Sequence, residues 1–428
     1  MAIITISTPL TSKKKYEILP YNDKYFFDRE DEIEEINRKI KAMLNNEGID
    51  RRTVVFRGER GTGKTWLLLH LKRNKIANLS KQKIETLYIN FDGCIEKQKD
   101  EFIVDYNKSL DDFLDELAQQ WNLSFPSNAT LQEKSHWLID ELSRRLSDKI
   151  LVVFLDGISS ASPAFLQSLE EYWLKYLAKR RDVLIIMSTR GEMYRWISPE
   201  LRLFVESHEL GPFSRGAISD YLERMERYLA ARDDQEGLPH KADEAVYEAG
   251  GGFALSTYWL ARYGPDQVDA LIALLLEFIG DDKKRELIRV YLEALSVLNP
   301  WQPTDQSPRG FREEEMQRML PAHPQLSSQS WPMPEVRRVR DTLQQYHLLR
   351  WDGDVGGYVI DAAIRYPIAY ALRRKHPDIW QRLHAAAAQM YRGWGEKFAR
   401  YRDYYDNLAR LHSEQGPEAA ATAEVSGP

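Results

Sequence analysis

Hydrophobic positions in the first half of the chain follow two different periods. Between residues 29 and 44 they recur every third or fourth position, which predicts a helix with one buried stripe. Short continuous apolar runs follow, separated by helical stretches, at residues 53–56, 86–89, 150–155 and 183–187. Continuous apolar strands that alternate with amphipathic helices are typical of a parallel sheet with both faces covered, so we predict an α/β domain here.

After about residue 206 the strand pattern stops and helical periodicity takes over. The first helices that we expect span residues 214–222, 242–248, 255–262 and 267–279. The next block begins near residue 283. Its three expected helices span residues 286–297, 311–320 and 335–349, and its apolar hairpin spans residues 348–351 and 358–360. Three helices closed by a hairpin is the order of a winged helix-turn-helix. Residues 369–412 are again helical in pattern, and the Gly/Ala/Pro-rich residues 413–428 predict a flexible tail.

A complete phosphate-binding motif lies between the first predicted strand and a helix that begins at Trp66. It reads Gly58, Glu59, Arg60, Gly61, Thr62, Gly63, Lys64, Thr65. In this pattern, G-x-x-x-x-G-K-[ST], the glycines let backbone N–H groups close around phosphate oxygens, and the helix N-terminus adds partial positive charge. We expect Lys64 to reach the β- and γ-phosphates and the Thr65 hydroxyl to bind Mg²⁺. The whole segment, Trp66 included, is the predicted nucleotide-binding loop.

A carboxylate for the metal ion follows the buried strand at 150–155, which ends in Asp156. Ligands bind at the carboxyl ends of strands in such sheets, so Asp156 is the second predicted Mg²⁺ ligand and, with Lys64, a predicted catalytic residue. The next residues are Gly157-Ile158-Ser159-Ser160. A glutamate that would activate water is therefore absent from the usual place, and Glu170 or Glu171 would have to substitute. We expect an ATPase of low turnover at most.

A third charged group follows the strand at 183–187, in the tripeptide Ser188-Thr189-Arg190. A basic group at this strand end would lie beside the nucleotide-binding loop. Arg190 would then contact the γ-phosphate and distinguish ATP from ADP, which makes it the third predicted catalytic residue. The alternative is an ordinary ion pair between Arg190 and a surface acid.

Composition excludes several classes of function. The 428 residues include 59 Lys+Arg and 65 Asp+Glu, a net charge of −6, so the chain as a whole is not built to coat nucleic acid. The single cysteine excludes an internal disulfide framework. No apolar run approaches the roughly 20 residues of a membrane-spanning helix, and residues 1–15 lack the layout of a signal peptide. We therefore expect a cytoplasmic protein without membrane contact.

With these motifs the chain resembles the STAND class of P-loop NTPases, signal-transduction ATPases related to AAA+. The N-terminal signature of the family, two apolar residues and G-R-E-x-E, is similar to Phe26-Phe27-Asp28-Arg29-Glu30-Asp31-Glu32, with Asp28 in place of glycine. The resemblance implies that Phe27 and Arg29 line the adenine and ribose side of the nucleotide. Ser188-Thr189-Arg190 looks like the T-T-R sensor of the NB-ARC branch. Asp156-Gly157 looks like the start of the NACHT element D-G-x-D-E, with Ser159 and Ser160 where the two acids would be.

Two further elements of the family have weaker counterparts. The lid element G-G-x-P-L-A-L is similar to Ala249-Gly250-Gly251-Gly252-Phe253-Ala254-Leu255. Phe253 stands at the proline position that touches adenine, so the resemblance implies that Phe253 binds the base. Tyr358-Val359-Ile360-Asp361 lies where the M-H-D-like motif of the winged helix would be, with Ile360 in place of the histidine that would contact ADP.

The resemblance implies an α/β P-loop domain followed by an all-α lid, a winged helix and C-terminal helices. The segments are an N-terminal arm (residues 1–24), the nucleotide-binding domain (25–205), the lid (206–281), the winged helix (282–368), the C-terminal helices (369–412) and the tail (413–428). It also implies a switch that binds ATP or ADP with Mg²⁺. Such a switch self-associates in the ATP state or recruits a separate effector or sensor protein.

Two other functions stay open. The first is a DNA-associated AAA+-like ATPase of the replication-initiator or loader type, in which Arg337, Arg338 and Arg340 of the helix at 335–349 would contact DNA phosphates. The acidic balance and the missing glutamate after Asp156 count against it, so DNA binding is possible but not favoured. The second is a scaffold that holds one nucleotide and never cycles.

Overall fold

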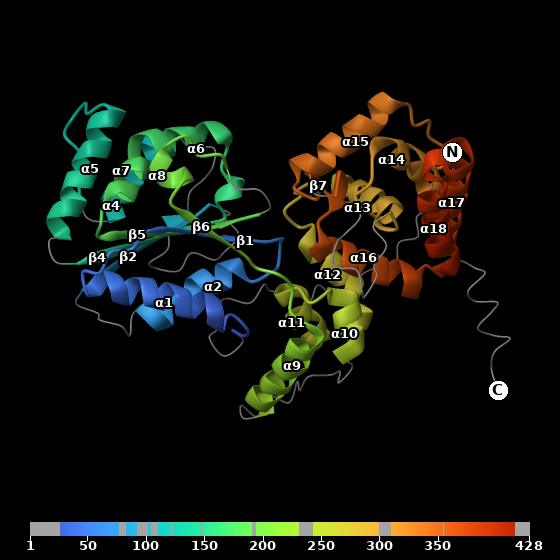
Figure 1. Cartoon of the computed structure of the whole chain (residues 1–428), viewed down its shortest axis with the longest axis horizontal. Helices are drawn as coiled ribbons and strands as arrows, with labels where there is room; N and C mark the ends of the chain where they lie inside the picture. The colour runs from blue at the N-terminus through green and yellow to red at the C-terminus, as the bar shows by residue number, and fades with distance from the viewer. Residues whose placement is uncertain are drawn as a thin grey trace.

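A computed structural model describes most of the chain between residues 26 and 415. The described residues are 26–76, 83–91, 102–103, 110–120, 123–146, 149–190, 194–230, 243–298, 310–353 and 355–415. The predicted arm at 1–24 and residues 416–428 of the predicted tail lie outside them. Figure 1 shows a sheet covered by helices beside a second, mostly helical part of the molecule.

Within the described ranges, the sheet has six parallel strands in the order β3-β2-β4-β5-β1-β6. Their bounds are β1 Thr53–Arg57, β2 Ile84–Asn90, β3 Phe102–Ile103, β4 Ile150–Asp156, β5 Val183–Thr189 and β6 Val205–Glu209. The four predicted strands are present as β1, β2, β4 and β5, so the predicted parallel sheet is confirmed. The sequence pattern missed β6, because this edge strand is only half-buried and carries no continuous apolar run.

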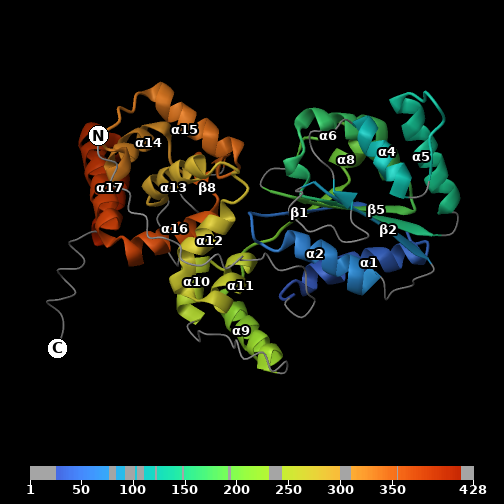
Figure 2. The same ribbon diagram turned by 180° about the vertical axis from the view of Figure 1, so that it is seen from behind.

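Helices cover both faces of this sheet (Figures 1 and 2). One face carries α1 Glu30–Leu44 and α2 Lys64–His70, and the other carries α4 Leu110–Gln120, α5 Leu131–Arg145, α6 Pro163–Leu169, α7 Lys175–Lys179 and α8 Pro199–Arg202. Successive side chains of β1 point to opposite faces of the sheet, because side chains alternate along a strand. Val54 packs in the same cluster as Ile36 of α1, whereas Val55 belongs to the cluster of Leu166 in α6.

The register of the central strands decides which candidate site residues lie together at one edge of the sheet. β5 lies between β1 and β4, with Arg57 opposite Thr189 and Leu155 opposite Met187. All three strands run parallel, so their carboxyl ends meet at one edge of the sheet. This edge therefore brings together the loop after β1, the residues that follow β5, and Asp156 at the end of β4.

The second part of the molecule begins with four helices and continues as a winged helix. The four are α9 Arg215–Ala230, α10 Asp243–Gly250, α11 Ala254–Tyr263 and α12 Val268–Leu275. The winged helix consists of α13 Asp282–Ser296, α14 Glu313–Met319, α15 Met333–Gln345 and the antiparallel pair β7 Leu349–Asp352 and β8 Gly357–Ile360. The last helices are α16 Ala362–Lys375, α17 Pro377–Lys397 and α18 Arg402–Glu414. The predicted order of P-loop sheet, helices, winged helix and C-terminal helices is thus present.

The helices of the second part from α10 onward share one apolar core. Buried residues from α10 to α18 form a single cluster, and Leu271 of α12, Leu292 of α13 and Leu383 of α17 all belong to it. Helix α16 crosses the boundary that we predicted between residues 368 and 369. The domain limits therefore stay predictions, whereas the element order is observed.

Several single-turn or irregular helical segments complete the described elements. They are Leu71–Ile76, Ile158–Ser160, Glu170–Leu174, Pro265–Gln267, Leu320–Ala322, Pro324–Leu326 and Ala399–Tyr401. Across the described ranges, no helix has both the length and the apolar character that crossing a membrane requires.

Candidate nucleotide-binding site

The loop between β1 and α2 has the backbone that its glycines allow. Gly63, directly before α2, has a φ of 93°, in the left-handed region that favours glycine. At Gly58 a Cβ atom would lie 2.6 Å from the carbonyl oxygen of Leu210, so a side chain does not fit. The loop therefore packs tightly against the segment that follows β6, and its backbone path depends on glycine at both positions.

Lys64 points into this loop. Its side chain is almost fully buried, and Nζ donates hydrogen bonds to the carbonyl oxygens of Gly58 at 2.7 Å and Glu59 at 2.6 Å. Nζ also lies 3.3 Å from Oγ1 of Thr62. The ammonium group is thus held at the centre of the loop, where the motif predicts that it meets phosphates. Thr65 follows it in the first turn of α2, and Trp66 packs against the clusters on both sides of this helix.

Asp156 is held by two hydroxyl groups. Its side chain is 1% exposed at the end of β4, and Oδ2 accepts a hydrogen bond from the Tyr88 hydroxyl of β2 at 2.7 Å. The Ser188 hydroxyl donates to Oδ1 and accepts from the backbone N–H of Gly157 at 2.8 Å. These contacts fix the orientation of the carboxylate beside the loop. Sequence reasoning missed Tyr88, because a tyrosine in a buried strand carries no signal that it faces a carboxylate one strand away.

The two candidate substitutes for a general base have different surroundings. Glu170 is buried in the helical segment after α6, and its Oε1 accepts hydrogen bonds from the backbone N–H groups of Ile197 and Ser198 at 2.8 and 2.5 Å. This carboxylate therefore anchors the segment before α8. Glu171 is exposed on the same helix. Ser159 accepts a hydrogen bond from the backbone N–H of Arg190 at 3.1 Å.

The N-terminal signature lies against the loop and against α9. Arg29 Nη2 donates to the carbonyl oxygens of Thr62 at 3.0 Å and Gly211 at 2.8 Å. The ring of Phe27 lies 6.0 Å from the ring of Tyr221 on α9. Asp28 has a φ of 56°, in the left-handed region that favours glycine. The structure places Phe27 and Arg29 beside the loop, and their contact with adenine and ribose stays a prediction.

The lid element reaches the loop from the other side. The backbone N–H of Leu255 donates to the carbonyl oxygen of Gly61 at 3.2 Å. Phe253 is 2% exposed and its ring lies 6.2 Å from the ring of Tyr366 on α16. Phe253 is therefore packed between the loop and the winged-helix side, and its role in binding the base stays a prediction.

The side chains of Glu59 and Arg60 leave the loop and bind the second part of the molecule. Arg60 Nη1 donates to the carbonyl oxygen of Leu275 at the end of α12 at 2.8 Å, and its guanidinium lies 3.9 Å from the centre of the Phe278 ring. Glu59 Oε2 accepts a hydrogen bond at 2.8 Å from the backbone N–H of Ala362, the first residue of α16. Sequence reasoning assigned both residues to nucleotide binding and missed these contacts.

Asp361 is the charged residue that the winged-helix side adds to the site. It precedes α16, and its Oδ1 accepts a hydrogen bond from the backbone N–H of Ala363 at 2.9 Å. Burial raises the pKa of Asp361, and the nearby positive charges of Arg60, Arg190 and Lys64 oppose that rise. Two of the predicted catalytic residues, Lys64 and Arg190, are therefore near enough to act electrostatically on the same carboxylate.

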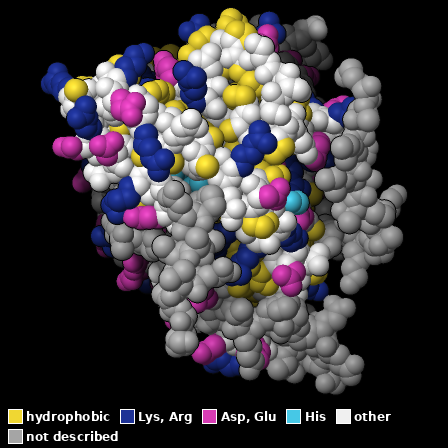
Figure 3. Space-filling model, turned by 90° about the vertical axis from the view of Figure 1, so that its right-hand side faces the viewer, with side chains coloured by type: hydrophobic (Ala, Val, Ile, Leu, Met, Phe, Trp, Pro, Cys, Tyr) yellow, Lys and Arg dark blue, Asp and Glu magenta, His cyan; other side chains and the backbone are white. Residues whose placement is uncertain are grey.

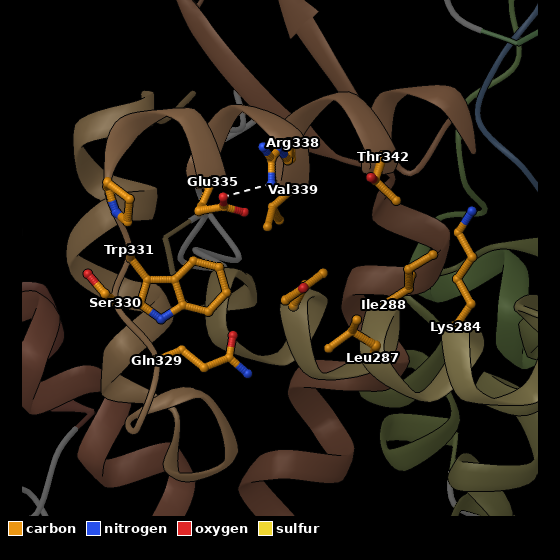
Figure 4. A pocket seen from close by; sticks show the side chains of 12 residues that line it. Lys284, Leu287, Ile288, Gln329, Ser330, Trp331, Glu335, Arg338, Val339 and Thr342 are labelled. Carbon is orange, nitrogen blue, oxygen red and sulfur yellow. Dashed lines mark hydrogen bonds and ion pairs between the residues drawn. The ribbon is translucent and has the colours of Figure 1, made fainter.

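The arginines of α15 have a different setting. Arg337 and Arg340 both pair with Glu313 of α14, and Arg340 also pairs with Asp341. Arg338 pairs with Glu335 at 2.7 Å on the rim of a groove of about 540 Å³ between α13 and α15, where Trp331 and Val339 supply apolar surface (Figure 4). Figure 3 shows basic and acidic side chains interspersed over the described part of the face that carries α17.

The chain has only low similarity to proteins of known structure. No family model and no curated protein matches the chain. The structure of Cdc6p from Pyrobaculum aerophilum is 16% identical, covers 81% of this chain and 95% of its own, and has a TM-score of 0.40. The Aeropyrum pernix ORC2 protein in its ADP form is 15% identical, with 85% and 97% covered and a TM-score of 0.45. The Aeropyrum pernix ORC1 protein in complex with DNA is 15% identical, with 82% and 93% covered and a TM-score of 0.36.

These neighbours are Cdc6 and ORC proteins, and one of them is described in complex with DNA. Their names lie nearer to the replication-initiator alternative than to the STAND switch. Their TM-scores and sequence identities are low, so these neighbours do not indicate what this chain binds. The P-loop fold itself is observed directly in the strand order, the loop after β1 and the buried acid at the end of β4.

Proposed function

We propose that this protein is a switch controlled by Mg²⁺ and ATP or ADP. The observation that carries the proposal is the set of contacts made by three consecutive loop residues. Glu59 binds the start of α16, Arg60 binds the end of α12, and Gly61 accepts a hydrogen bond from α11. A nucleotide held by this loop alters the charge and shape of the surface that these three helices contact, so its binding shifts the equilibrium between two arrangements of the second part.

In this proposal each site residue has a defined task. Lys64 binds the β- and γ-phosphates, Thr65 and Asp156 hold Mg²⁺, and Arg190 contacts the γ-phosphate. The Tyr88 and Ser188 hydroxyl groups orient Asp156. Because Ser159 and Ser160 follow Asp156 and Glu170 anchors backbone, hydrolysis is slow and nucleotide exchange drives the switch.

Solution mass and shape test the proposal. Light scattering and small-angle X-ray scattering would be recorded with Mg²⁺–ADP and then with Mg²⁺ and a non-hydrolysable ATP analogue. A change of shape with the analogue alone supports the switch, and an increase to a defined larger mass adds the self-assembly that the STAND resemblance implies. A single tightly held nucleotide, with the same mass and shape under both conditions, supports the scaffold instead.

DNA association is the second candidate function, and the winged helix itself favours it. In this reading α15 lies in the major groove, and Arg337, Arg338 and Arg340 exchange their acidic partners for phosphates. Each exchange first breaks an ion pair on the protein, which lowers the net gain. Duplex binding that weakens steeply with salt and requires these arginines would support this function over a switch that acts through a protein partner.

A further inference from the structure

Two carboxylates share the N-terminal end of α16, one from each side of the contact. Glu59, from the nucleotide-binding loop, accepts from the backbone N–H of Ala362. Asp361, from the winged-helix side, accepts from the backbone N–H of Ala363. The N–H groups of a first helical turn carry partial positive charge, which attracts both carboxylates. We use the name α16 clasp for the hydrogen bond from Ala362 to Glu59. Arg350 of β7 lies beside it, with Nη2 3.7 Å from Oε1 of Glu59.

Opposing charges surround the pair on both sides. Arg350 and Arg365 face Glu59 from the winged-helix side and favour its ionised form. On the sheet side, the positive charges of Arg60, Arg190 and Lys64 favour the ionised form of Asp361. Burial of Glu59, followed by the negative charge of Asp361, outweighs these effects and raises the pKa of Glu59 to about 7. Glu59 therefore changes its charge near neutral pH while it forms the clasp.

We infer that Glu59 and Asp361 form a charge sensor. The α16 clasp stays closed while Glu59 is protonated, and it opens when Glu59 is ionised and a nucleoside triphosphate binds the loop. The inference rests on the proposed function, because it requires a nucleotide at this loop. Lys64 and Arg190 are the cations assigned to the phosphates, and their positive charges also stabilise the ionised form of Asp361. A triphosphate competes with Asp361 for them, and two poorly compensated carboxylates then repel each other across the clasp.

The sign of the pH dependence follows from the two states of Glu59. In the clasp the pKa of Glu59 is about 7, whereas in the open state it returns toward the ordinary value of 4.5. The clasped state binds the proton more tightly, so acidification from pH 7 toward 4.5 favours the clasp, and a rise in pH favours opening. A single proton limits the effect on the clasp equilibrium to about tenfold per pH unit.

Hydrogen–deuterium exchange of the segment 359–366 reports on the clasp, because the Ala362 N–H is bonded to Glu59. The full-length protein would be measured at pH 6 and pH 8, with and without Mg²⁺ and a non-hydrolysable ATP analogue, with rates corrected for intrinsic exchange. We expect the analogue to speed exchange about tenfold or more at pH 8 and only slightly at pH 6. Calorimetry on the same samples establishes whether the analogue binds.

Three variants make the test specific. Glu59→Gln keeps the acceptor oxygen but removes the charge, so the segment stays protected at both pH values. Asp361→Asn removes the repulsion and also retains protection at pH 8. Glu133→Gln is the matched control: Glu133 accepts the backbone N–H of Thr130 at 2.8 Å at the start of α5, and the variant should behave like the wild type.

The outcomes separate the sensor from the proposed function. Equal pH dependence in Glu59→Gln and the wild type overturns the sensor. Binding of the analogue to the wild type without a change in exchange at pH 8 also overturns the sensor and leaves the nucleotide site standing. No binding of nucleotide at either pH overturns the proposed function, and the sensor with it.

Discussion

The nucleotide-binding loop and the outer face of α15 are both rich in charge, but they differ in how the charges are arranged. At the loop, Lys64, Arg190 and Asp361 come from elements far apart in the sequence, and the two cations act electrostatically on the carboxylate. On α15, Arg338 pairs with Glu335 one turn away, and Arg340 pairs with its neighbour Asp341. The loop concentrates charges that only the tertiary fold can bring together, whereas α15 neutralises its charges within the helix and against Glu313 of the preceding helix α14.

This difference indicates where the ligand binds. Gathering like and unlike charges in a partly buried place costs free energy, and such clusters with a shifted pKa mark functional sites. Exposed ion pairs of the α15 kind contribute roughly 0–1 kcal/mol and form on most protein surfaces. This difference supports the proposed ligand site at the loop and predicts that the α15 face is an ordinary solvated surface. Each of the following experiments tests either the proposed site at the loop or the α15 face.

The largest effect is expected from Lys64→Ala. The substitution removes charge-assisted hydrogen bonds to phosphate worth about 3 kcal/mol, which corresponds to a loss of about 100-fold in nucleotide affinity. Titration with a fluorescent ATP analogue in the presence of Mg²⁺ measures it. Lys41→Ala, at an exposed position near the end of α1, is the control that should bind like the wild type. Equal affinity in the Lys64 variant would contradict the nucleotide site.

A smaller effect is expected from Tyr88→Phe. The buried carboxylate of Asp156 loses the hydrogen bond to Oδ2, which destabilises the protein by about 1–3 kcal/mol. If Asp156 binds Mg²⁺, the ion satisfies the carboxylate instead, so Mg²⁺ and nucleotide together should recover part of the lost stability. Urea unfolding with and without Mg²⁺–ADP measures both quantities.

Tyr391→Phe is the matched control for this variant. The Tyr391 hydroxyl donates to the buried Glu315 carboxylate at 2.6 Å in the core of the second part. We expect a similar loss of stability from this substitution, but no extra recovery from Mg²⁺–ADP. Equal recovery in both variants would mean that the metal does not bind at Asp156.

Local sequence patterns were sufficient for the parts of the site that lie on single elements. The glycine spacing identified the loop, and the apolar run before Asp156 placed this carboxylate at a strand end. Neighbouring strands then carried Arg190 to the same edge, as expected for parallel β5. These features follow from the periodicity of strands and from the backbone freedom of glycine, so no tertiary information was needed.

Contacts between distant elements were not predictable in this way. Tyr88 and Asp156 are 68 residues apart, and Glu59 and Ala362 are 303 apart. Neither pair shares a helix face or a turn, so nothing in the local pattern connects them. The motif also gives its second position no fixed role, and the fold alone determines that Glu59 turns toward α16 instead of the nucleotide. The edge strand β6 was missed for a related reason, because half-burial leaves it without an apolar run.

The smallest effect is expected from the α15 face. The triple substitution of Arg337, Arg338 and Arg340 by Ala removes ion pairs worth roughly 0–1 kcal/mol each, and should change duplex DNA binding less than about twofold. Arg410→Ala on α18 removes a similar exposed pair with Glu414 and is the control. Fluorescence anisotropy with a labelled duplex would be measured between about 50 and 200 mM salt, where phosphate contacts produce a steep loss of affinity. A steep salt dependence in the wild type that the triple variant abolishes, but the control retains, would reverse the comparison and make α15 the ligand-binding surface.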